Sequence, residues 1–235
     1  MKRNVFLTAM LALFMSAANM SAQISKGYDV VAMSPEVEAM CNQVIELQID
    51  DPDQGNKILQ KTLKKVSKDK EQLIAVGDFF LNKNLFPVAK MCADQLYKLD
   101  PKYIPGLMFA GQVNKARGFA TNNDQFFGLA GQKYEEVLAL YSTNVAALQQ
   151  NVTIYKNINP AAAMDYLKNI QSIDPNNYTV WKDMADVAYT LQRYDEAREN
   201  YEKYFSLVPE HDIDQLAAQN YVVSISSAMD FAKLD

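Results

Sequence analysis

Residues 178–211 read YTVWKDMADVAYTLQRYDEARENYEKYFSLVPEH, and they divide into two helical patterns with a short break between them. The apolar residues of each half recur every three or four positions, which is the spacing of one face of an α-helix. Small residues at Ala185 and Ala197 allow two such helices to approach closely, and Pro209 ends the second because proline cannot continue a helix interior. The apolar positions are Trp181, Met184, Ala185 and Ala188, then Tyr194, Ala197, Tyr201, Tyr204 and Phe205. The stretch therefore predicts a pair of packed helices.

The same pattern recurs earlier in the chain with a period of 34 residues. Ala163 precedes Ala197 by that step, and Pro175 precedes Pro209 by the same step. Such self-similarity is typical of a stacked array, because a single helix pair cannot bury its apolar face alone. Residues 70–103 carry the pattern again, at Leu73, Val76, Gly77, Phe80, Phe86, Ala89, Ala93, Leu96 and Pro101. The sequence therefore predicts an all-α array, which fits a chain with only 8 Gly and 8 Pro for turns.

These repeats resemble the tetratricopeptide repeat (TPR) family, whose pattern runs Trp, Leu-Gly and Tyr in the first helix and Ala, Phe, Ala and Pro afterwards. Trp181, Ala197, Tyr201 and Pro209 fit this pattern, whereas Ala185 stands where the family has Gly. The resemblance covers about residues 34–211. It implies a right-handed α-solenoid of about five stacked helix pairs, and a protein that binds other proteins and is not an enzyme.

The expected units are irregular in three places. The unit at 144–177 is weaker in its first helix, because Gln150 and Asn151 replace the Leu-Gly pair. The unit at 104–143 is longer, since Ala89 and Ala130 are 41 residues apart, and we place its extra residues in an inter-helix loop at 117–128. The complete set is 34–69, which is degenerate, then 70–103, 104–143, 144–177 and 178–211. Residues 212–235 are expected to form a C-terminal capping helix, because a terminal repeat must cover its last apolar face.

The first 22 residues have the layout of a secretory signal peptide. Two basic residues open the segment, residues 5–14 form an apolar run, and small residues follow. Cleavage before Gln23 fits best, and cleavage after Ala18 is the alternative. We therefore expect an exported protein, in the periplasm, on the periplasmic face of the outer membrane, or secreted. Residues 23–33 have weak periodicity and are expected to form a flexible leader.

The charge balance argues against two classes of partner. Loss of the basic signal segment would change the formal net charge from −5 to −7. Nucleic-acid binding needs a basic face, and attraction to anionic lipid needs basic clusters. We therefore expect neither nucleic acid nor an anionic lipid surface as a partner. Because no apolar stretch after the signal segment approaches 18 residues, we also expect no transmembrane segment in the mature chain. A protein or peptide, from another exported envelope protein, is the expected partner.

The residues that usually carry chemistry are sparse. His211 is the one histidine, no nucleotide-binding or metalloprotease motif is present, and the acidic stretch at 50–55 departs from a calcium loop at three ligand positions. Cys41 and Cys92 each lie in helical apolar spacing, which favours two separate core thiols over the disulfide that export would allow. No cofactor, metal or catalytic site is expected. An enzyme with a site near the loop at 117–128 is the less favoured alternative, because that loop offers no nucleophile and base.

The TPR resemblance also implies where a partner would bind. In that family the first helix of each pair lines a concave groove, and fixed positions of that helix face the ligand. Mapped onto this sequence, these positions are Ile74, Asp78, Leu81, Met108, Gln112, Lys115, Leu148, Val152, Tyr155, Lys182, Asp186 and Tyr189. The middle of this face is apolar and aromatic, which favours an apolar peptide or helix as the ligand.

Alternatives to this groove remain open at the level of sequence. The TPR proteins that clamp a carboxylate use Lys and Asn where this chain has Ile74 and Asp78, so a carboxylate clamp is not expected. Leu148 and Val152 either face the groove or pack internally against an adjacent helix. The protein could instead be a structural subunit of an outer-membrane or periplasmic complex, held through its convex face or its cap.

Overall fold

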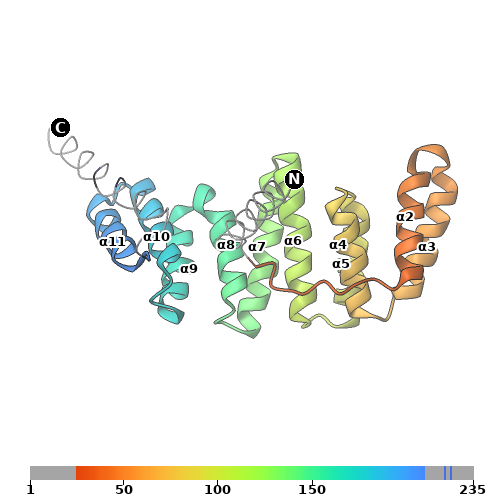
Figure 1. The fold of residues 1–235 in the computed structure, drawn as a ribbon, viewed down its shortest axis with the longest axis horizontal. Coiled ribbons are helices and arrows are strands. Elements are labelled where there is room, and N and C mark those ends of the chain that lie inside the picture. Colours follow the sequence, from red (N-terminus) through yellow and green to blue (C-terminus); the bar gives the residue numbers. More distant parts are fainter. Residues whose placement is uncertain (1–24, 210–219, 221–222, 224–235) are drawn as a thin grey trace, which may run out of the picture.

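The computed structural model describes residues 25–209, 220 and 223. Within this part the chain forms ten α-helices and no strand (Figure 1). The helices are α2 (Pro35–Asp50), α3 (Pro52–Val66), α4 (Lys70–Asn82), α5 (Phe86–Leu99), α6 (Ile104–Thr121), α7 (Asp124–Leu140), α8 (Val145–Ile158), α9 (Pro160–Ile173), α10 (Tyr178–Thr190) and α11 (Tyr194–Leu207). The expected signal peptide at 1–22, His211 and the capping helix at 212–235 lie outside the described residues.

Consecutive helices pack as pairs, and the pairs follow one another along the long axis of the molecule (Figure 1). The pairs are α2 with α3, α4 with α5, α6 with α7, α8 with α9, and α10 with α11. The prediction of an all-α solenoid of TPR-like helix pairs is confirmed. The TPR pattern places the first helix of each pair on the inner side of the array. These helices are α2, α4, α6, α8 and α10.

Short polar residues and prolines begin the helices. The Asp69 carboxylate accepts hydrogen bonds from the backbone N–H groups of Glu71 (3.1 Å) and Gln72 (3.0 Å), which satisfies two orphan donors of α4. Asn159 caps α9 in the same way, through the N–H of Ala162 at 3.2 Å. Prolines lie in the first turn of α2, α3, α5, α6 and α9, where their missing N–H costs nothing. These local signals mark where most of the helices start.

Glycines set how closely neighbouring helices approach. A Cβ atom added at Gly77 in α4 would lie 2.4 Å from Cζ of Phe109, and one added at Gly111 in α6 would lie 2.4 Å from Cε1 of Tyr134. Real Cβ contacts are never so short, so each aromatic ring lies directly on a bare helix backbone. Phe109 and Tyr134 are fully buried, and they fill the space between adjacent helices. The solenoid spacing therefore depends on small residues facing large rings.

The prediction that residues 117–128 form an inter-helix loop was wrong. The structure joins α6 to α7 through only Asn122 and Asn123, and the extra residues of this unit lengthen both helices. Asn122 ends α6 in the left-handed conformation (φ 47°), and the Asn123 side chain accepts a hydrogen bond from the N–H of Gln125 at 2.9 Å. Arg117 lies 4.0 Å from the ring centroid of Phe126, across the helix pair. The polar residues of this region therefore shape a helical hairpin.

Replacing Gly111 by Ala should destabilise the protein by about 1–3 kcal/mol, because the new methyl group would overlap the Tyr134 ring and force the helices apart. The matched control is Gly128→Ala in α7, where no atom lies within 4 Å of the added Cβ. That change should stabilise the protein by about 0.5–1 kcal/mol through helix propensity. Chemical denaturation monitored by circular dichroism measures both effects. Equal midpoints for the two variants would contradict the packing role of Gly111.

Candidate functional site

Residues 25–33, called the leader here, cross the inner side of the solenoid without helix or strand structure. The segment runs from α8 past α6 and α4 to the start of α2 (Figure 1). At one end the Gln150 side-chain amide donates to the carbonyl of Ser25 at 2.9 Å. At the other end the Gln72 side chain donates to the carbonyl of Ala32 at 3.1 Å, and its Oε1 accepts from the N–H of Ser34 at 3.1 Å. The expectation of a flexible leader is corrected, because helix side chains hold this segment through its main chain.

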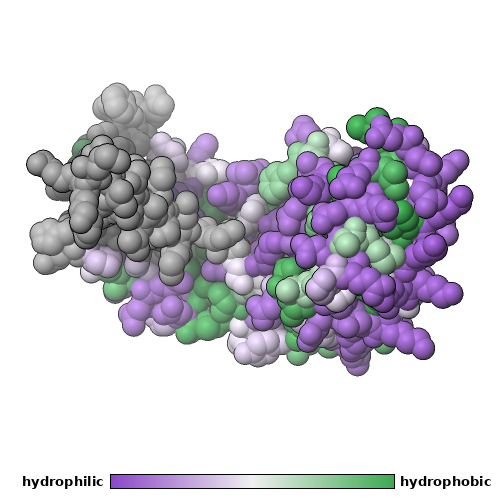
Figure 2. Space-filling view, turned by 45° about the vertical axis from the view of Figure 1, so that its right-hand side comes forward, coloured by the Kyte–Doolittle hydropathy of each residue, from purple (hydrophilic) through white to green (hydrophobic). Residues whose placement is uncertain are grey.

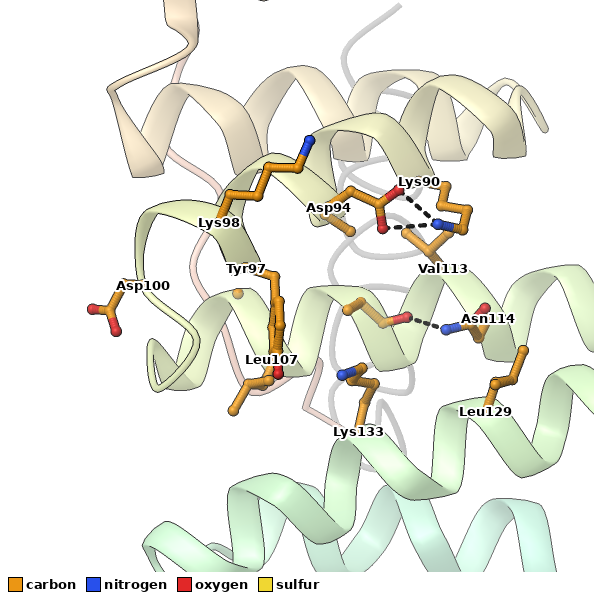
Figure 3. Close-up of a pocket in the computed structure, with 13 residues that line it drawn as sticks. Lys90, Asp94, Tyr97, Lys98, Asp100, Leu107, Val113, Asn114, Leu129 and Lys133 are labelled. Carbon is orange, nitrogen blue, oxygen red and sulfur yellow. Dashed lines mark hydrogen bonds and ion pairs between the residues drawn. The ribbon is translucent and has the colours of Figure 1, made fainter.

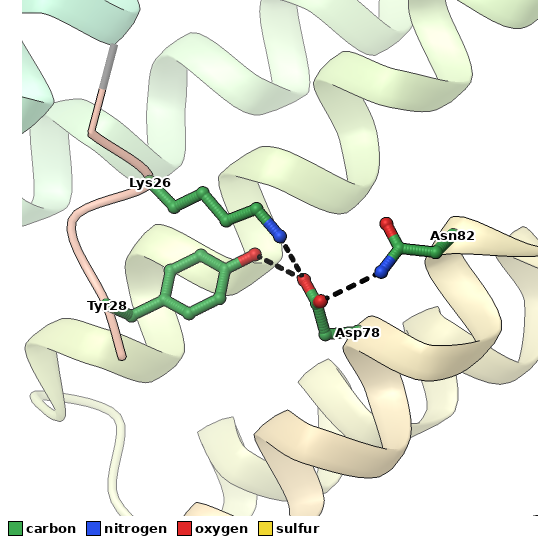
Figure 4. Close-up of polar contacts among 4 residues, drawn as sticks. All are labelled: Lys26, Tyr28, Asp78 and Asn82. Carbon is green, nitrogen blue, oxygen red and sulfur yellow. Dashed lines mark hydrogen bonds and ion pairs between the residues drawn. The ribbon is translucent and has the colours of Figure 1, made fainter. Parts of the chain in front are cut away.

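Asp78 in α4 is the charged anchor of the leader (Figure 4). Its Oδ1 lies 2.7 Å from the Nζ of Lys26 and accepts a hydrogen bond from the Tyr28 hydroxyl at 3.2 Å. Its Oδ2 accepts from the Asn82 side-chain amide, one turn further along the same helix, at 3.0 Å. Asp78 is only 6% exposed. A carboxylate so buried is costly unless it is paired and hydrogen-bonded, and two of its three donors come from the leader.

Gly27 lies between the two leader residues that contact Asp78, and its backbone conformation favours glycine. Its φ angle is +74°, in the left-handed region that side chains disfavour. A Cβ atom at this position would also lie 2.4 Å from Cε of Met108 and 3.0 Å from Cβ of Ala146. The main chain of the leader therefore lies directly against α6 and α8.

Tyr28 fits between the anchor and the core. Its ring packs edge-to-face on Phe109, with the two centroids 5.7 Å apart and an interplanar angle of 88°. Burial raises the pKa of Tyr28 far above its ordinary range, and the charge and hydrogen bond of Asp78 raise it further. The phenol therefore stays protonated and acts as a hydrogen-bond donor to the carboxylate.

Lys115 in α6 supports the other end of the leader. Its amine donates to Oε1 of Gln150, the residue whose amide nitrogen holds Ser25. Burial lowers the pKa of Lys115 to about 8, so the amine remains largely protonated at neutral pH. Gln112 lies one turn before Lys115, and among the described residues its Oε1 has no hydrogen-bond partner. Polar side chains of α6 and α8 therefore support the Ser25 end of the leader.

The structure moves several predicted partner-binding residues into the core. The first helices are packed on more than one side, so a wider arc of each is covered than a groove-lining register allows. The interpretation in which Leu148 and Val152 pack internally is the correct one. The buried apolar residues of the predicted set are Ile74, Leu81, Met108, Leu148 and Val152.

The remaining predicted residues lie on the C-terminal part of the inner side. Tyr155 in α8 stacks on Tyr166 of α9, with centroids 5.8 Å apart. Lys182 and Asp186 form an ion pair of 2.7 Å along α10, and the Tyr201 hydroxyl also donates to Asp186. Tyr189 is 45% exposed at the end of the same helix. These residues are not brought together with the leader anchor on α4, so the predicted set divides into two regions.

Sequence reasoning missed five residues of the leader contact. Lys26 and Tyr28 were missed because an aperiodic segment gives no sign of where it packs. Asn82 and Gln72 lie on α4 outside the register of the mapped face. Gln150 did give a signal, since it departs from the apolar Leu-Gly pattern of the repeat. A polar residue at a position where the repeat is apolar here marks a contact.

A pocket of about 390 Å³ lies on the side of the second helices, between α5, α6 and α7 (Figure 3). Its floor includes Leu107 and Val113, and its rim includes Tyr97, Leu129 and Lys133. The Lys133 amine lies 4.5 Å from the centroid of the Tyr97 ring. Elsewhere hydrophilic residues dominate the face seen in Figure 2, and hydrophobic residues lie among them in small groups. The pocket therefore offers an apolar recess with a charged rim among the second helices.

The cysteines and the acidic stretch that the sequence singles out have structural roles in the part that the structure describes. Cys41 and Cys92 are free and fully buried, as their spacing predicts. Burial raises the pKa of Cys41 to about 11 and that of Cys92 to about 12, so neither thiol is activated. Asp51 from the acidic stretch caps α3, through the N–H of Gln54 at 3.0 Å. Within residues 25–209, 220 and 223 no three metal-ligating side chains are grouped.

We also compared the length and hydropathy of the described helices with those of a membrane-spanning helix. None of them combines the length and the hydropathy that crossing a membrane requires.

Comparison with known proteins identifies the repeat in the C-terminal part of the chain. Residues 155–219 match the tetratricopeptide repeat model. This range includes α9, α10 and α11, and with them most of the stretch that decides the fold. The sequence has no significant match among curated protein sequences.

Solved structures extend the TPR likeness over most of the chain. MamA residues 41 to the end, from Desulfovibrio magneticus RS-1, gives a TM-score of 0.52 at 17% identity, covering 75% of this chain and 97% of MamA. PilF of Pseudomonas aeruginosa gives 0.51 at 15% identity, covering 83% and 91%. A chain of Naa15/Naa10 bound to HypK-THB gives 0.52 at 16% identity, covering 83% of this chain and 29% of that one. At such low identity these similarities show that the chain has a TPR fold.

Replacing Asp78 by Ala should release the leader from the TPR helices. The change removes the acceptor of Lys26 and Tyr28, and hydrogen bonds to a charged group contribute about 1.5–3 kcal/mol each before discount for the exposed part of Lys26. Trypsin should then cut after Lys26 at least about ten times faster, because cleavage follows the population of the open segment. Mass spectrometry of the fragment that begins at Gly27 measures the rate.

The matched control for this prediction is Asp94→Ala, which removes the exposed partner of Lys90 in α5. It should leave the cleavage rate after Lys26 unchanged. If both variants are cut there as slowly as the wild type, Asp78 does not hold the leader.

Proposed function

We propose that this protein is an exported, non-enzymatic TPR scaffold that binds an extended segment of another envelope protein on its inner side. The observation that carries the proposal is the leader itself. The inner side holds nine residues of extended chain through helix side chains that contact main-chain groups, at Gln72 and Gln150, and through one buried carboxylate, Asp78. Side chains arranged in this way recognise a peptide, since they bind groups that every peptide has.

The contact region for a partner includes α10, beyond the leader. Lys182, Asp186 and Tyr189 lie there and combine a cation, an anion and an exposed phenol ring. Tyrosine supplies a large and rigid contact area with a polar tip, which is why it is frequent at protein interfaces. A partner that contacts both α8 and α10 would bind alongside the Ser25 end of the leader.

A second candidate function rests on the outer pocket between α5, α6 and α7. The pocket has an apolar floor and an exposed tyrosine, Tyr97, at its rim. A subunit of an envelope complex could hold this protein there, through its convex side.

Site-specific photocrosslinking distinguishes the two functions. A photoreactive amino acid placed at Tyr189 should form a discrete adduct with one envelope protein, whereas the same amino acid at Tyr97 should not. The two positions are matched, since the tyrosines are 45% and 48% exposed. Adducts at Tyr97 alone would favour the structural subunit, and equal smears at both positions would contradict a specific partner at either.

Export is tested separately. N-terminal sequencing of the protein from a periplasmic extract should give a chain that begins at Gln23, because the segment before it has the layout of a cleaved signal. A start at Asn19 would move the cut to the alternative site. Recovery of the intact Met1 chain from the cytosol would contradict export.

A further inference from the structure

We propose that the leader seat is a recognition site for extended segments carrying a basic residue, glycine and tyrosine in succession, and that the leader fills it in competition with a partner segment of the same chemistry. The leader seat comprises the surfaces of α4, α6 and α8 that contact residues 25–33. The inference deepens the proposed function, on which it rests, by naming the ligand of the inner side.

The first requirement of the seat is a cation. Asp78 is fixed in a buried position on α4, and among its described contacts Asn82 is the one donor that the helices supply. A buried carboxylate with a single neutral donor is costly, and an ammonium or guanidinium group offsets that cost. Lys26 meets the requirement from the leader, with its Nζ at 2.7 Å. The helices therefore present a charge that a ligand has to complete.

The second requirement is glycine at the next position. The φ angle of Gly27 is +74°, a conformation that residues with a side chain adopt only with strain. An added Cβ would also lie 3.0 Å from Cβ of Ala146 and would require the flexible end of Met108 to move. A residue larger than glycine is therefore disfavoured at this position of a bound segment.

The third requirement is tyrosine. The Tyr28 ring packs edge-to-face on Phe109, and the Tyr28 hydroxyl donates a hydrogen bond to Oδ1 of Asp78 at 3.2 Å. Phenylalanine would keep the ring contact and lose the hydrogen bond. The Asp78 carboxylate, the close contact at Gly27 and the Phe109 ring would therefore together select Lys, Gly and Tyr in succession.

The other contacts between the leader and the helices are hydrogen bonds to main-chain groups. Gln72 and Gln150 bind carbonyl and amide groups, so they accept any residue at the positions they contact. Asp29, Val30 and Ala32 are exposed, and substitutions there leave the contacts in place. Sequence tolerance after a selective tripeptide is the pattern of a linear recognition motif.

The manner in which the leader is held allows exchange. It has no helical or sheet hydrogen bonds, and its ammonium anchor belongs to a side chain that is 38% exposed. Segments with few buried contacts open at low free-energy cost, well below global unfolding. The leader is covalently linked to α2, so its effective concentration is on the order of millimolar, and a partner segment binds only in competition with it.

The test measures binding of a fluorescent peptide, SKGYDVVAMS, to the purified full chain by fluorescence anisotropy. The double variant Lys26→Ala/Tyr28→Ala removes both leader contacts with Asp78, so it should bind the peptide at least about tenfold more tightly than the wild type does. Adding Asp78→Ala to the double variant should abolish this gain. Circular dichroism and thermal melting establish that each variant is folded.

Peptide variants test each requirement. Replacing Lys by Glu or Gly by Ala in the peptide should weaken binding to the double variant at least about tenfold, since one reverses the charge and the other puts a side chain on a residue in the left-handed conformation. Replacing Asp by Asn at the exposed fifth position is the matched control and should change nothing. If the double variant fails to fold, Tyr28→Phe in the chain takes its place, with a smaller gain in affinity.

The outcomes separate this inference from the proposed function. Equal binding of all peptides, or none to a folded double variant, would overturn the leader seat as a recognition site. Specific adducts at Tyr189 in the same preparations would then leave the scaffold function standing. Loss of those adducts together with peptide binding would remove both.

Discussion

The close contact between Phe109 and Gly77 joins the two features on which this molecule depends. On one side the ring lies on the bare backbone of α4, which sets the distance between two helix pairs. On the other side it packs edge-to-face with Tyr28 of the leader. A side chain at position 77 would push the ring away, so the stacking of the array and the seating of the leader depend on the same small residue. The repeat pattern that builds the fold also builds the surface for a peptide.

The leader converts a structural array into a binding surface with a defined chemistry. A solenoid of helix pairs offers a long face, and nothing in the helical repeat alone says what that face prefers. Asp78 supplies the preference, because a buried carboxylate selects a cation and a hydrogen-bond donor. Gln72 and Gln150 fix the path of the leader across the helices, because each holds its main chain at one end. The proposed ligand chemistry is therefore that of the chain's own segment at residues 25–33, which these side chains hold.

Sequence reasoning reached the fold because the fold is periodic. Ala163 and Ala197 are separated by the same step as Pro175 and Pro209, and local signals such as Asp69 and Asn159 begin the helices where the pattern requires. It failed where the information is not local. The extra residues at 117–128 were placed in a loop, since a longer helix pair and a longer loop have the same length in sequence. The register of the inner face was partly wrong, because burial of Ile74 and Leu148 depends on which neighbours cover each helix.

The departures from the repeat were the informative residues for the site. Gln150 and Asn151 replace a Leu-Gly pair, and each is buried and hydrogen-bonded, Gln150 to Ser25 and Asn151 to Glu135. Buried polar residues cost free energy unless they have partners, so a repeat that keeps them is constrained by those partners. The same reasoning applies to a longer ligand. A partner segment with the same contacts as the leader competes with a segment that is covalently linked to the solenoid. A longer segment that continues over α8 to Lys182 and Tyr189 would gain contacts that the leader does not make. Under the proposed function, affinity for a partner then comes from the length of the inner side that the partner covers, since the leader already occupies part of that side.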